Sequence, residues 1–585
     1  MWLTKSQFAA RSAVSLVGTM KDPSDALELL SSRVDQLEKR VYALEHASEA
    51  AAPVQEKLFG PAGLATDEIP EVEASGVFPV LGKGLLGVAG AYILRALAES
   101  SSLPRSAVAV VAVAYAMAWL VWASRPKVSA RFAQLVYSGT SAVILAPMLW
   151  ELTLHFKTFS PWTSAGILGI YAVLAALLFW KRDVAPVVWI GHCSAALVAL
   201  SLGIATHALI PFIAVLLLLV ALWEYLAMRG RRGGATRHVV VLVCDVAIWG
   251  LIFIYSGPAN ARADYPHLGM AALIGPGCLL WAINGGALAG EVLFLRKTIS
   301  VFEAIQAVAA FALAVSGVMY FAPGAGMAVF GIVCLILASA CYAALFLRIM
   351  PSEDKRNRIV FGFWSAALTL AGVAWTLPPA AAAACLGAGA LVAIVIGVRR
   401  EIAMLELHGL LFLVAAALIS KAPEYAFEEL AGSVAAKPGL MLIAAGVCSV
   451  LFYAASKERP GERWPLQILH LIPALLAAFA LAALIVQGLL GLAAFAVNLG
   501  VHHVALIRTF TLCAISAAFA FGGSRWGRLE MTRIAYATLA FIAAKLLFED
   551  LRHGRMEFIA GSIFLFALTL IVVPRLVRMG ARVQR

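Results

Sequence analysis

The C-terminal stretch RIAYATLAFIAAKLLFEDLRHGRMEFIAGSIFLFALTLIVVPRLVR (Arg533–Arg578) decides the class of this protein. Tyr536–Phe548 is apolar, a charged turn follows at Glu549–Arg555, and Phe558–Val573 is apolar again. Two apolar segments joined by a short polar turn are typical of a helical hairpin that crosses a membrane and returns. The sequence therefore predicts a transmembrane helical hairpin at this end of the chain.

The composition extends this class to most of the 585 residues. Hydrophobic residues make up 62% of the chain and charged residues 13%, whereas soluble domains have roughly 45–50% and 25%. The mean hydropathy is +0.90. Only α-helices and closed barrels satisfy every backbone hydrogen bond in hydrocarbon, and the apolar runs here are long and unbroken. The sequence therefore predicts an all-α, polytopic transmembrane protein and excludes a water-soluble core.

No motif for a cofactor, a metal or a catalytic group is found. The eight cysteines fall inside apolar runs without paired short spacing, so neither a zinc site nor a disulfide framework is predicted. His502, His503, Arg508 and His470 leave a membrane-embedded transferase open as a third alternative. The longest outer connection, about Lys421 to Lys437, offers little material for a catalytic domain. We therefore predict no cofactor, no metal and no catalytic residue.

The first 76 residues are more polar and fall into three parts. Residues 1–23 lack a sustained apolar core followed by a cleavage site, so they do not resemble a signal peptide. Residues 24–47 have apolar side chains alternately three and four residues apart, which predicts a coiled coil. Residues 48–76, rich in Ala, Pro and Glu, are expected to form a flexible acidic linker. The seam of the coiled coil consists of Leu27, Leu30, Val34, Leu37, Val41 and Leu44.

Charges beside this seam favour a parallel pair of identical helices. In such a pair Arg33 would face Glu38, and opposite charges would meet again one heptad later. This pattern predicts a homodimer through the coiled coil. Because isolated helices of this length are marginal, an amphipathic helix lying on another protein or on the bilayer stays open as the alternative.

Residues 77–578 are predicted to form a membrane domain of about eighteen spans, arranged as stacked helical hairpins and followed by a basic cytoplasmic tail at 579–585. The expected spans are 77–98, 106–124, 132–154, 162–180, 186–206, 210–228, 238–256, 268–294, 299–321, 325–347, 359–377, 379–398, 402–420, 438–456, 465–487, 501–522, 533–548 and 557–574. With an even number of spans, both chain ends lie on the same side of the membrane.

The distribution of basic residues predicts which side that is. The ends of the even-numbered spans carry 27 Lys and Arg residues, and the opposite ends carry nine. By the positive-inside rule, both termini and the coiled coil are expected in the cytoplasm. Membrane topology thus accounts for the net charge of +12, and we expect the lipid bilayer rather than nucleic acid as a partner.

Two stretches point to a known family. They are LGKGLLGVAGAYILR (Leu81–Arg95) and AKLLFEDL (Ala544–Leu551), and they occur in a chain that places a coiled coil and an acidic linker before a long array of spans. This order resembles a bacterial family of predicted membrane proteins, domain of unknown function twenty-three thirty-nine. The second stretch is similar to that family's last hairpin, in which a Lys precedes an acidic turn. The resemblance implies a multi-pass protein of the bacterial cytoplasmic membrane and no established activity.

Ionisable side chains within spans are costly, about 2.5–3.5 kcal/mol at a helix centre on insertion scales, so each needs a partner, water or a function. Asp245 is the least compensated, since nothing on its own helix neutralises it. A structural pair with another span, a proton or substrate site, and exposure to water all remain open for it. The ionisable members of the candidate intramembrane polar site lie in the predicted cytoplasmic half of the membrane. The site consists of His192, Glu224, Asp245, Asn284, Glu291 and Glu303.

Glycines near Asn284 suggest how this site is built. Gly286 and Gly290 are spaced so that they would let two helices approach closely. The break at Gly275-Pro276-Gly277 would make the span 268–294 a discontinuous helix of the kind found in transporters. Close helix packing without transport is the alternative.

Charged residues also cluster near the outer ends of the spans. Arg95 and Glu99 are spaced i, i+4, as are Lys545 and Glu549, so each pair shares a helix face. With Asp550, these four residues are candidates for an outer polar gate. Snorkelling of long side chains to the membrane interface is the alternative.

Two functions from different classes fit these features. The first is a transporter or flippase-like protein for an envelope-related or lipid-like solute, with an interior lined by the polar residues. The second is a non-transporting membrane scaffold that recruits partners through its coiled coil. A continuous hydrated cavity would favour the transporter, and a solid interior would favour the scaffold.

Overall fold

A computed structural model describes residues 71–99, 104–125, 130–231, 234–350, 354–431, 440–456, 464–495, 500–551 and 555–583, together with Gln36 and Lys39. The predicted N-terminal segment, the coiled coil apart from those two residues, and the linker up to residue 70 lie outside the described residues. The chain divides into two units, Met1–Pro79 and Val80–Arg585. The arrangement of helices described below is that of the second unit.

Every regular element in the described part of the chain is helical, which confirms the all-α prediction. The elements are α3 (Glu71–Glu99), α4 (Arg105–Ala123), α5 (Arg131–Trp150), η1 (Glu151–His155), α6 (Pro161–Arg182), α7 (Ala185–Ala205), α8 (Leu209–Met228), α9 (Gly234–Ser256), η2 (Ala259–Arg262), α10 (Met270–Leu293), α11 (Val301–Phe321), α12 (Ala325–Ala344), η3 (Leu345–Ile349), α13 (Lys355–Thr376), α14 (Pro379–Arg400), α15 (Ala403–Ile419), α16 (Ala422–Ala431), α17 (Leu440–Ala455), α18 (Trp464–Ala493), α19 (Val501–Trp526), α20 (Leu529–Lys545), η4 (Leu546–Asp550) and α22 (Met556–Val583).

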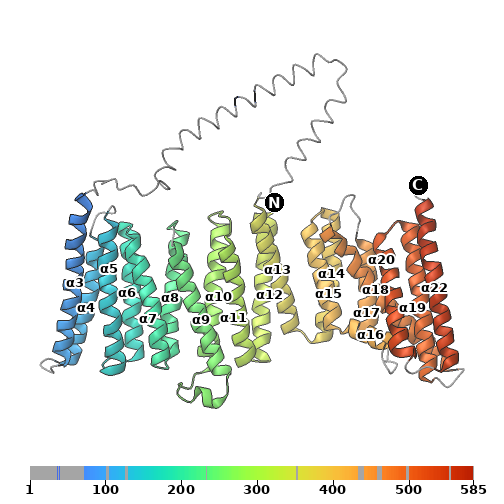
Figure 1. Cartoon of the computed structure of the whole chain (residues 1–585), viewed down its shortest axis with the longest axis horizontal. Coiled ribbons are helices and arrows are strands. Elements are labelled where there is room, and N and C mark those ends of the chain that lie inside the picture. The colour runs from blue at the N-terminus through green and yellow to red at the C-terminus, as the bar shows by residue number, and fades with distance from the viewer. Residues whose placement is uncertain are drawn as a thin grey trace, which may run out of the picture. The chain divides into compact units, whose positions relative to one another are not determined.

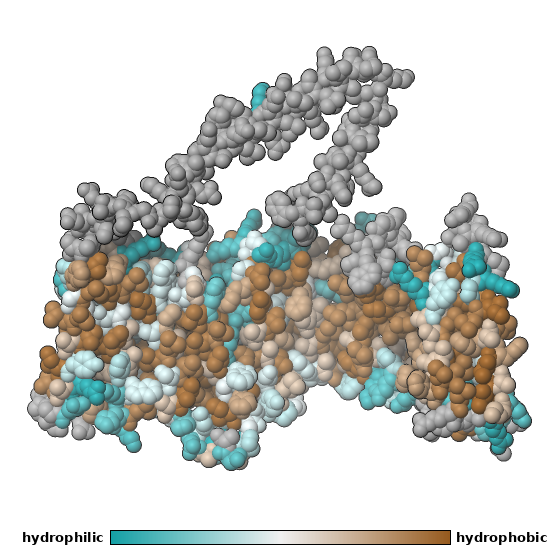
Figure 2. All heavy atoms as spheres, in the orientation of Figure 1, coloured by the Kyte–Doolittle hydropathy of each residue, from teal (hydrophilic) through white to brown (hydrophobic). Residues whose placement is uncertain are grey.

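Most of these helices have the length and composition of membrane spans. Among the described residues, 16 helices are long and apolar enough to cross a bilayer, or up to 17 if α15 and α16, which meet at 58°, form one span. The helix α17 is apolar but has 16 residues. Figure 2 shows a broad hydrophobic band bordered by hydrophilic residues at its upper and lower edges. These features indicate a multi-pass membrane protein, while the number of eighteen spans stays a prediction.

The helices from α3 to α18 follow one another roughly in chain order, and α19, α20 and α22 lie together at the C-terminal end of the row (Figure 1). Extensive packing joins helices close in this order, and no helix near the start of the row packs extensively on one near its end. The described helices therefore do not close into a ring around a central pore.

The closest helix pairs differ from the predicted hairpins. α20 and α22, the two helices of the C-terminal hairpin, each pack more extensively on α19 than on one another. Close pairs also form between α12 and α13 and between α14 and α15, which belong to different predicted hairpins. A Cβ on Gly372 of α13 would lie only 2.9 Å from the carbonyl oxygen of Gly331 on α12. Small residues that let backbones approach thus decide the pairing.

The helix α10 runs without interruption through Pro276, so the discontinuous helix, one of the two alternatives for this span, is not observed. Its close approach to a neighbour is at Gly277, where a Cβ would lie 3.3 Å from the backbone of Ala314 on α11. A Cβ on Gly290 would meet the Met228 side chain, and one on Gly286 would meet nothing within 4 Å. Close backbone packing through Gly286 and Gly290 is therefore not observed.

Candidate functional site

Arg237 joins two of the predicted carboxylates. From α9, its Nε and Nη2 donate to Oε1 and Oε2 of Glu224 on α8 at 3.1 and 2.7 Å, a bidentate pair. Its Nη1 donates to Oε1 of Glu303 on α11 at 2.9 Å. Only 5% of the Glu224 side chain is exposed, and 15% of each of the other two. One shielded ion-pair network therefore joins three helices.

Glu303 has a second role at the start of α11. Its Oε2 accepts a hydrogen bond from the backbone N–H of Ser300 at 2.8 Å, and the Ser300 hydroxyl accepts one from the backbone N–H of Glu303 at 3.2 Å. This capping box follows from the spacing S-x-x-E in the sequence. The cap holds the carboxylate in the position from which it reaches Arg237.

Glu291 and Asn284 on α10 complete the group. Glu291 Oε1 lies 3.5 Å from the Nζ of Lys297, which also donates to the carbonyl oxygen of Ala227 at the end of α8 at 2.9 Å. A cation at a helix C-terminus is stabilised by the helix dipole. Asn284 Nδ2 donates to the carbonyl oxygen of Leu280 on its own helix at 3.0 Å.

These side chains surround a very small polar cavity of about 10 Å³. That volume holds about one water molecule. The site is therefore a packed ion-pair network and not a hydrated passage. Four of the six predicted residues, Glu224, Asn284, Glu291 and Glu303, line this cavity together with Arg237, Leu288, Phe302 and Gln306.

Asp245 lies beside this group. Its Oδ1 accepts a hydrogen bond at 2.9 Å from Nε2 of Gln306 on α11, and Gln306 also lines the polar cavity. The partner of Asp245 thus comes from another span, which agrees with the first of its three alternatives, a structural pair with another span. The sequence offered no signal for this partner, because Gln306 carries no charge and lies 61 residues away.

His192 is not brought to the site. On α7, its Nε2 lies 2.9 Å from the carbonyl oxygen of Ala172. Its ring packs edge-on against Trp223, with centroids 5.4 Å apart. The side chain is fully buried and does not line the polar cavity.

Lys545 is the centre of a buried network between α19 and the end of α20. Its Nζ lies 2.7 Å from Asp550 Oδ1 and 3.3 Å from Glu549 Oε2, and it donates to the Thr509 hydroxyl at 3.0 Å. Arg508 Nη1 lies 2.9 Å from Glu549 Oε1, and Thr509 donates to Asp550 Oδ2 at 3.0 Å. None of the Lys545 side chain is exposed. This degree of burial exceeds what interfacial snorkelling would require.

Arg95 and Glu99 form a separate group near the start of the row. Arg95 Nε lies 3.1 Å from Glu99 Oε1, and its Nη1 lies 2.8 Å from Glu151 Oε1 in η1. The residues predicted as one outer gate thus belong to two ion-pair groups on helices that do not pack together extensively.

The histidines considered for a transferase are not assembled either. His502 and His503 lie beside Phe558, whereas His470 Nδ1 lies 2.9 Å from the Ser456 hydroxyl. In the described ranges no group of three His, Cys, Asp or Glu side chains could hold a metal ion.

The structure also contains an apolar groove that the sequence analysis missed. Its volume is about 530 Å³, within the range of about 300–1,000 Å³ of ligand pockets. Gly285, Gly286 and Ala289 of α10 and Ala340 and Ala344 of α12 form two of its walls. The sequence signal for this groove was the series of small residues on α10, which leave space beside the helix.

Comparison with family models, curated proteins and solved structures found no match for this chain.

Proposed function

We propose that the protein is a flippase-like transporter of a lipid-like solute, which enters the groove between α10 and α12 from the bilayer. The apolar groove carries this proposal. It is lined from Cys278 to Leu293 along α10, a length of about 22 Å at 1.5 Å per residue. The hydrocarbon core of a bilayer is about 30 Å thick. A groove of this length and polarity suits an acyl chain better than a hydrophilic solute.

The groove is accessible from the side. Val333 and Leu337 on its α12 wall are 40% and 37% exposed. Leu288 of α10 lines both the groove and the small polar cavity, so one helix separates an apolar site from an ion-pair network. Pro276 removes a backbone hydrogen bond near the other end of α10 and gives the helix a position at which to bend. Movement of α10 would thus affect both sites.

A lipid-translocation assay tests this function. Protein in liposomes that contain fluorescent phospholipids should speed the exchange of lipid between leaflets. Gly286→Leu should slow that exchange severalfold, because Gly286 lines the groove and has open space for a side chain. Gly250→Leu is the matched control, since Gly250 of α9 also has open space but lines none of the cavities described here. Equal rates for both variants and the wild type would contradict the proposal.

A non-transporting scaffold is the second candidate. The observation that favours it is the polar site itself, whose charges are paired around a cavity with room for about one water molecule. If wild-type protein moves no lipid, while removal of residues 24–47 releases proteins that otherwise copurify with it, the scaffold is the better explanation.

We infer that the protein lies in the bacterial cytoplasmic membrane with both termini in the cytoplasm, and that it dimerises through residues 24–47. The excess of Lys and Arg at the ends of the even-numbered spans supports the orientation. The opposed charges beside the heptad seam support the dimer. The resemblance of two stretches to a bacterial family supports the location.

A further inference from the structure

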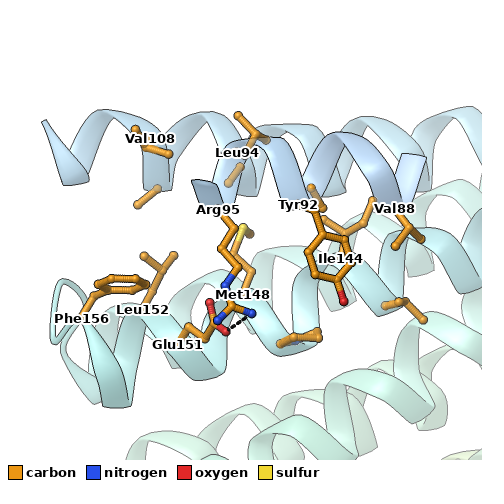
Figure 3. Close-up of a pocket in the computed structure, with 15 residues that line it drawn as sticks. Val88, Tyr92, Leu94, Arg95, Val108, Ile144, Met148, Glu151, Leu152 and Phe156 are labelled. Atoms are coloured by element: carbon orange, nitrogen blue, oxygen red, sulfur yellow. Dashed lines mark ion pairs between the residues drawn. The ribbon is translucent and has the colours of Figure 1, made fainter. Parts of the chain in front are cut away.

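A third cavity lies between α3, α4 and α5, well away in the row from the groove of α10 and α12. Its volume is about 140 Å³, comparable to engineered apolar cavities of about 150 Å³ that bind benzene. Figure 3 shows its walls, with Leu94 of α3, Val108 of α4 and Ile144 of α5 among the apolar side chains. The cavity therefore has room for part of an acyl chain.

Glycines hold α3 in the position that forms this cavity. The Tyr115 hydroxyl of α4 donates to the carbonyl oxygen of Gly87 at 3.0 Å. A Cβ on Gly87 would lie 2.6 Å from the ring of Trp119, and one on Gly84 would lie 2.9 Å from Val136. After these glycines, α3 continues with residues 91–95, most of which have large side chains. The cavity lies beside these five residues, four of which line it.

One ion pair lies at the wall of this otherwise apolar cavity. Arg95 and Glu151 both line it, whereas Glu99, the other partner of Arg95, does not. The three side chains are 50%, 24% and 55% exposed, so the group is open to an incoming polar headgroup. Together they carry one positive and two negative charges, which leaves a net charge of −1.

This group has hydrogen-bonding capacity to spare. Of its five N–H groups, Arg95 donates one to Glu99, and its Nη1 forms an ion pair with Glu151. Glu151 uses Oε1 for Arg95, and its Oε2 has no partner among the described residues. In Figure 3, Tyr92 and Phe156 lie on either side of the ion pair. A ligand with both a cationic donor and an anionic acceptor would satisfy the free oxygen and the free N–H groups together.

We propose that this cavity binds a phospholipid whose headgroup carries a primary amine. Part of an acyl chain fills the apolar space, and the phosphate accepts hydrogen bonds from the free N–H groups of Arg95. The ammonium group donates to Glu151 Oε2. The net negative charge disfavours an anionic headgroup, and a quaternary ammonium group has no N–H to donate. Tyr92, 65% exposed, adds an aromatic ring beside the cation.

Native mass spectrometry of the full-length protein tests this site with three dioleoyl phospholipids of the same chain length. Phosphatidylethanolamine should bind about tenfold more tightly than phosphatidylcholine, the difference expected for one hydrogen bond to a charged group. Phosphatidylglycerol should bind no better than phosphatidylcholine. Equal or tighter binding of phosphatidylglycerol would overturn the proposal.

Two variants of the Arg95 ion-pair group test which carboxylate causes the preference for phosphatidylethanolamine. Glu151→Gln should abolish most of the tenfold preference, because it removes the carboxylate that receives the ammonium group. Glu99→Gln removes the same charge from Arg95's other partner outside the cavity, so most of the preference should survive. Equal loss of the preference in both variants would show that it depends on the total charge of the group and not on Glu151. No loss in Glu151→Gln would show that the lipid binds elsewhere. Either result overturns the proposal.

A third variant tests the acyl-chain part. Ala91→Phe fills the cavity from α3 and should weaken binding of all three lipids, with thermal melting used to verify that the variant is folded. Unchanged binding in a folded variant would overturn the proposal. Gly286→Leu in the groove should leave the preference intact, so this site and the proposed transport are tested separately.

Discussion

The Nζ of Lys545 lies 2.7 Å from the Oδ1 of Asp550, five residues further along the chain. In an α-helix, side chains five residues apart point roughly 140° away from each other. Here Leu546–Asp550 forms one turn of π-helix, in which the N–H of Leu551 donates to the carbonyl oxygen of Leu546. This wider turn places Asp550 next to Lys545. Such turns are frequent at functional sites.

Lys545→Met should destabilise the protein strongly, because it leaves the buried carboxylate of Asp550 without its cation, whereas Glu549 keeps Arg508. The expected loss is about 3–5 kcal/mol in the free energy of unfolding, the range for a buried pair that loses one partner in soluble proteins. Thermal unfolding in detergent and abundance in the membrane measure the effect. Glu557→Gln is the control, since Glu557 is exposed at the start of α22. A loss no larger than the control's would contradict a buried network.

Asp245→Asn should leave stability nearly unchanged, because the amide oxygen of Asn still accepts a hydrogen bond from Gln306. Asp245→Leu leaves that buried amide without an acceptor and should cost about 1–3 kcal/mol. Both variants are compared by thermal unfolding and by the lipid-translocation assay. Normal stability with lost translocation in Asp245→Asn would show that the charge acts in transport.

Arg237→Gln should destabilise the protein more than Glu303→Gln does. The first change leaves Glu224 and Glu303 close together without a cation, whereas the second removes one of the two anions. Gln also fits the third position of a capping box, so Glu303→Gln retains the cap on Ser300. Unfolding in detergent compares these variants with Glu303→Ala, which loses both the ion pair and the cap. The loss of stability is expected to be largest in Arg237→Gln, smaller in Glu303→Ala and smallest in Glu303→Gln. A larger loss in Glu303→Gln than in the other two variants would contradict this explanation.

Gly372→Ala should lower the free energy of unfolding by about 1–3 kcal/mol, the usual cost of overpacking. Its Cβ would lie 2.9 Å from the Gly331 carbonyl oxygen, and backbone atoms cannot move aside as a flexible side chain does. Gly286→Ala is the matched control, because the space around Gly286 is open and Ala favours a helix by up to about 1 kcal/mol. Equal stability of the two variants would mean that α12 and α13 do not approach as closely as described.

Reporter fusions should place the loops on opposite sides of the membrane in alternation. Fusions after Arg232 and after Arg578 should both report a cytoplasmic position, because they follow even-numbered spans rich in basic residues. A fusion near Ala261, beyond the end of α9, should report an external position. An external result at Arg578 would show an odd number of spans.

The sequence also predicted part of the candidate site. The cost of burying a charge identified Glu224, Glu291, Glu303 and Asp245 as residues that need partners. It did not identify those partners, because Arg237 was read as a topology signal at a span end and Gln306 is uncharged. The capping spacing of Ser300 and Glu303 is a signal in the sequence that was not used, and it would have placed Glu303 at the start of a helix. The convergence of these residues depends on which helix faces meet.

The sequence by itself determined the class of this protein. The length of the apolar runs, the scarcity of charge and the alternation of basic residues can all be read locally along the chain. Because an unpaired backbone is costly in hydrocarbon, such apolar runs must form helical spans. Only the tertiary structure decided which helices pair, where Asp550 points and where cavities remain. Those features depend on the contacts of Gly331 with Gly372, on one π-helical turn and on the open space beside Gly286. Glycine allows either close packing or an open groove, and only the position of the neighbouring helix selects between them.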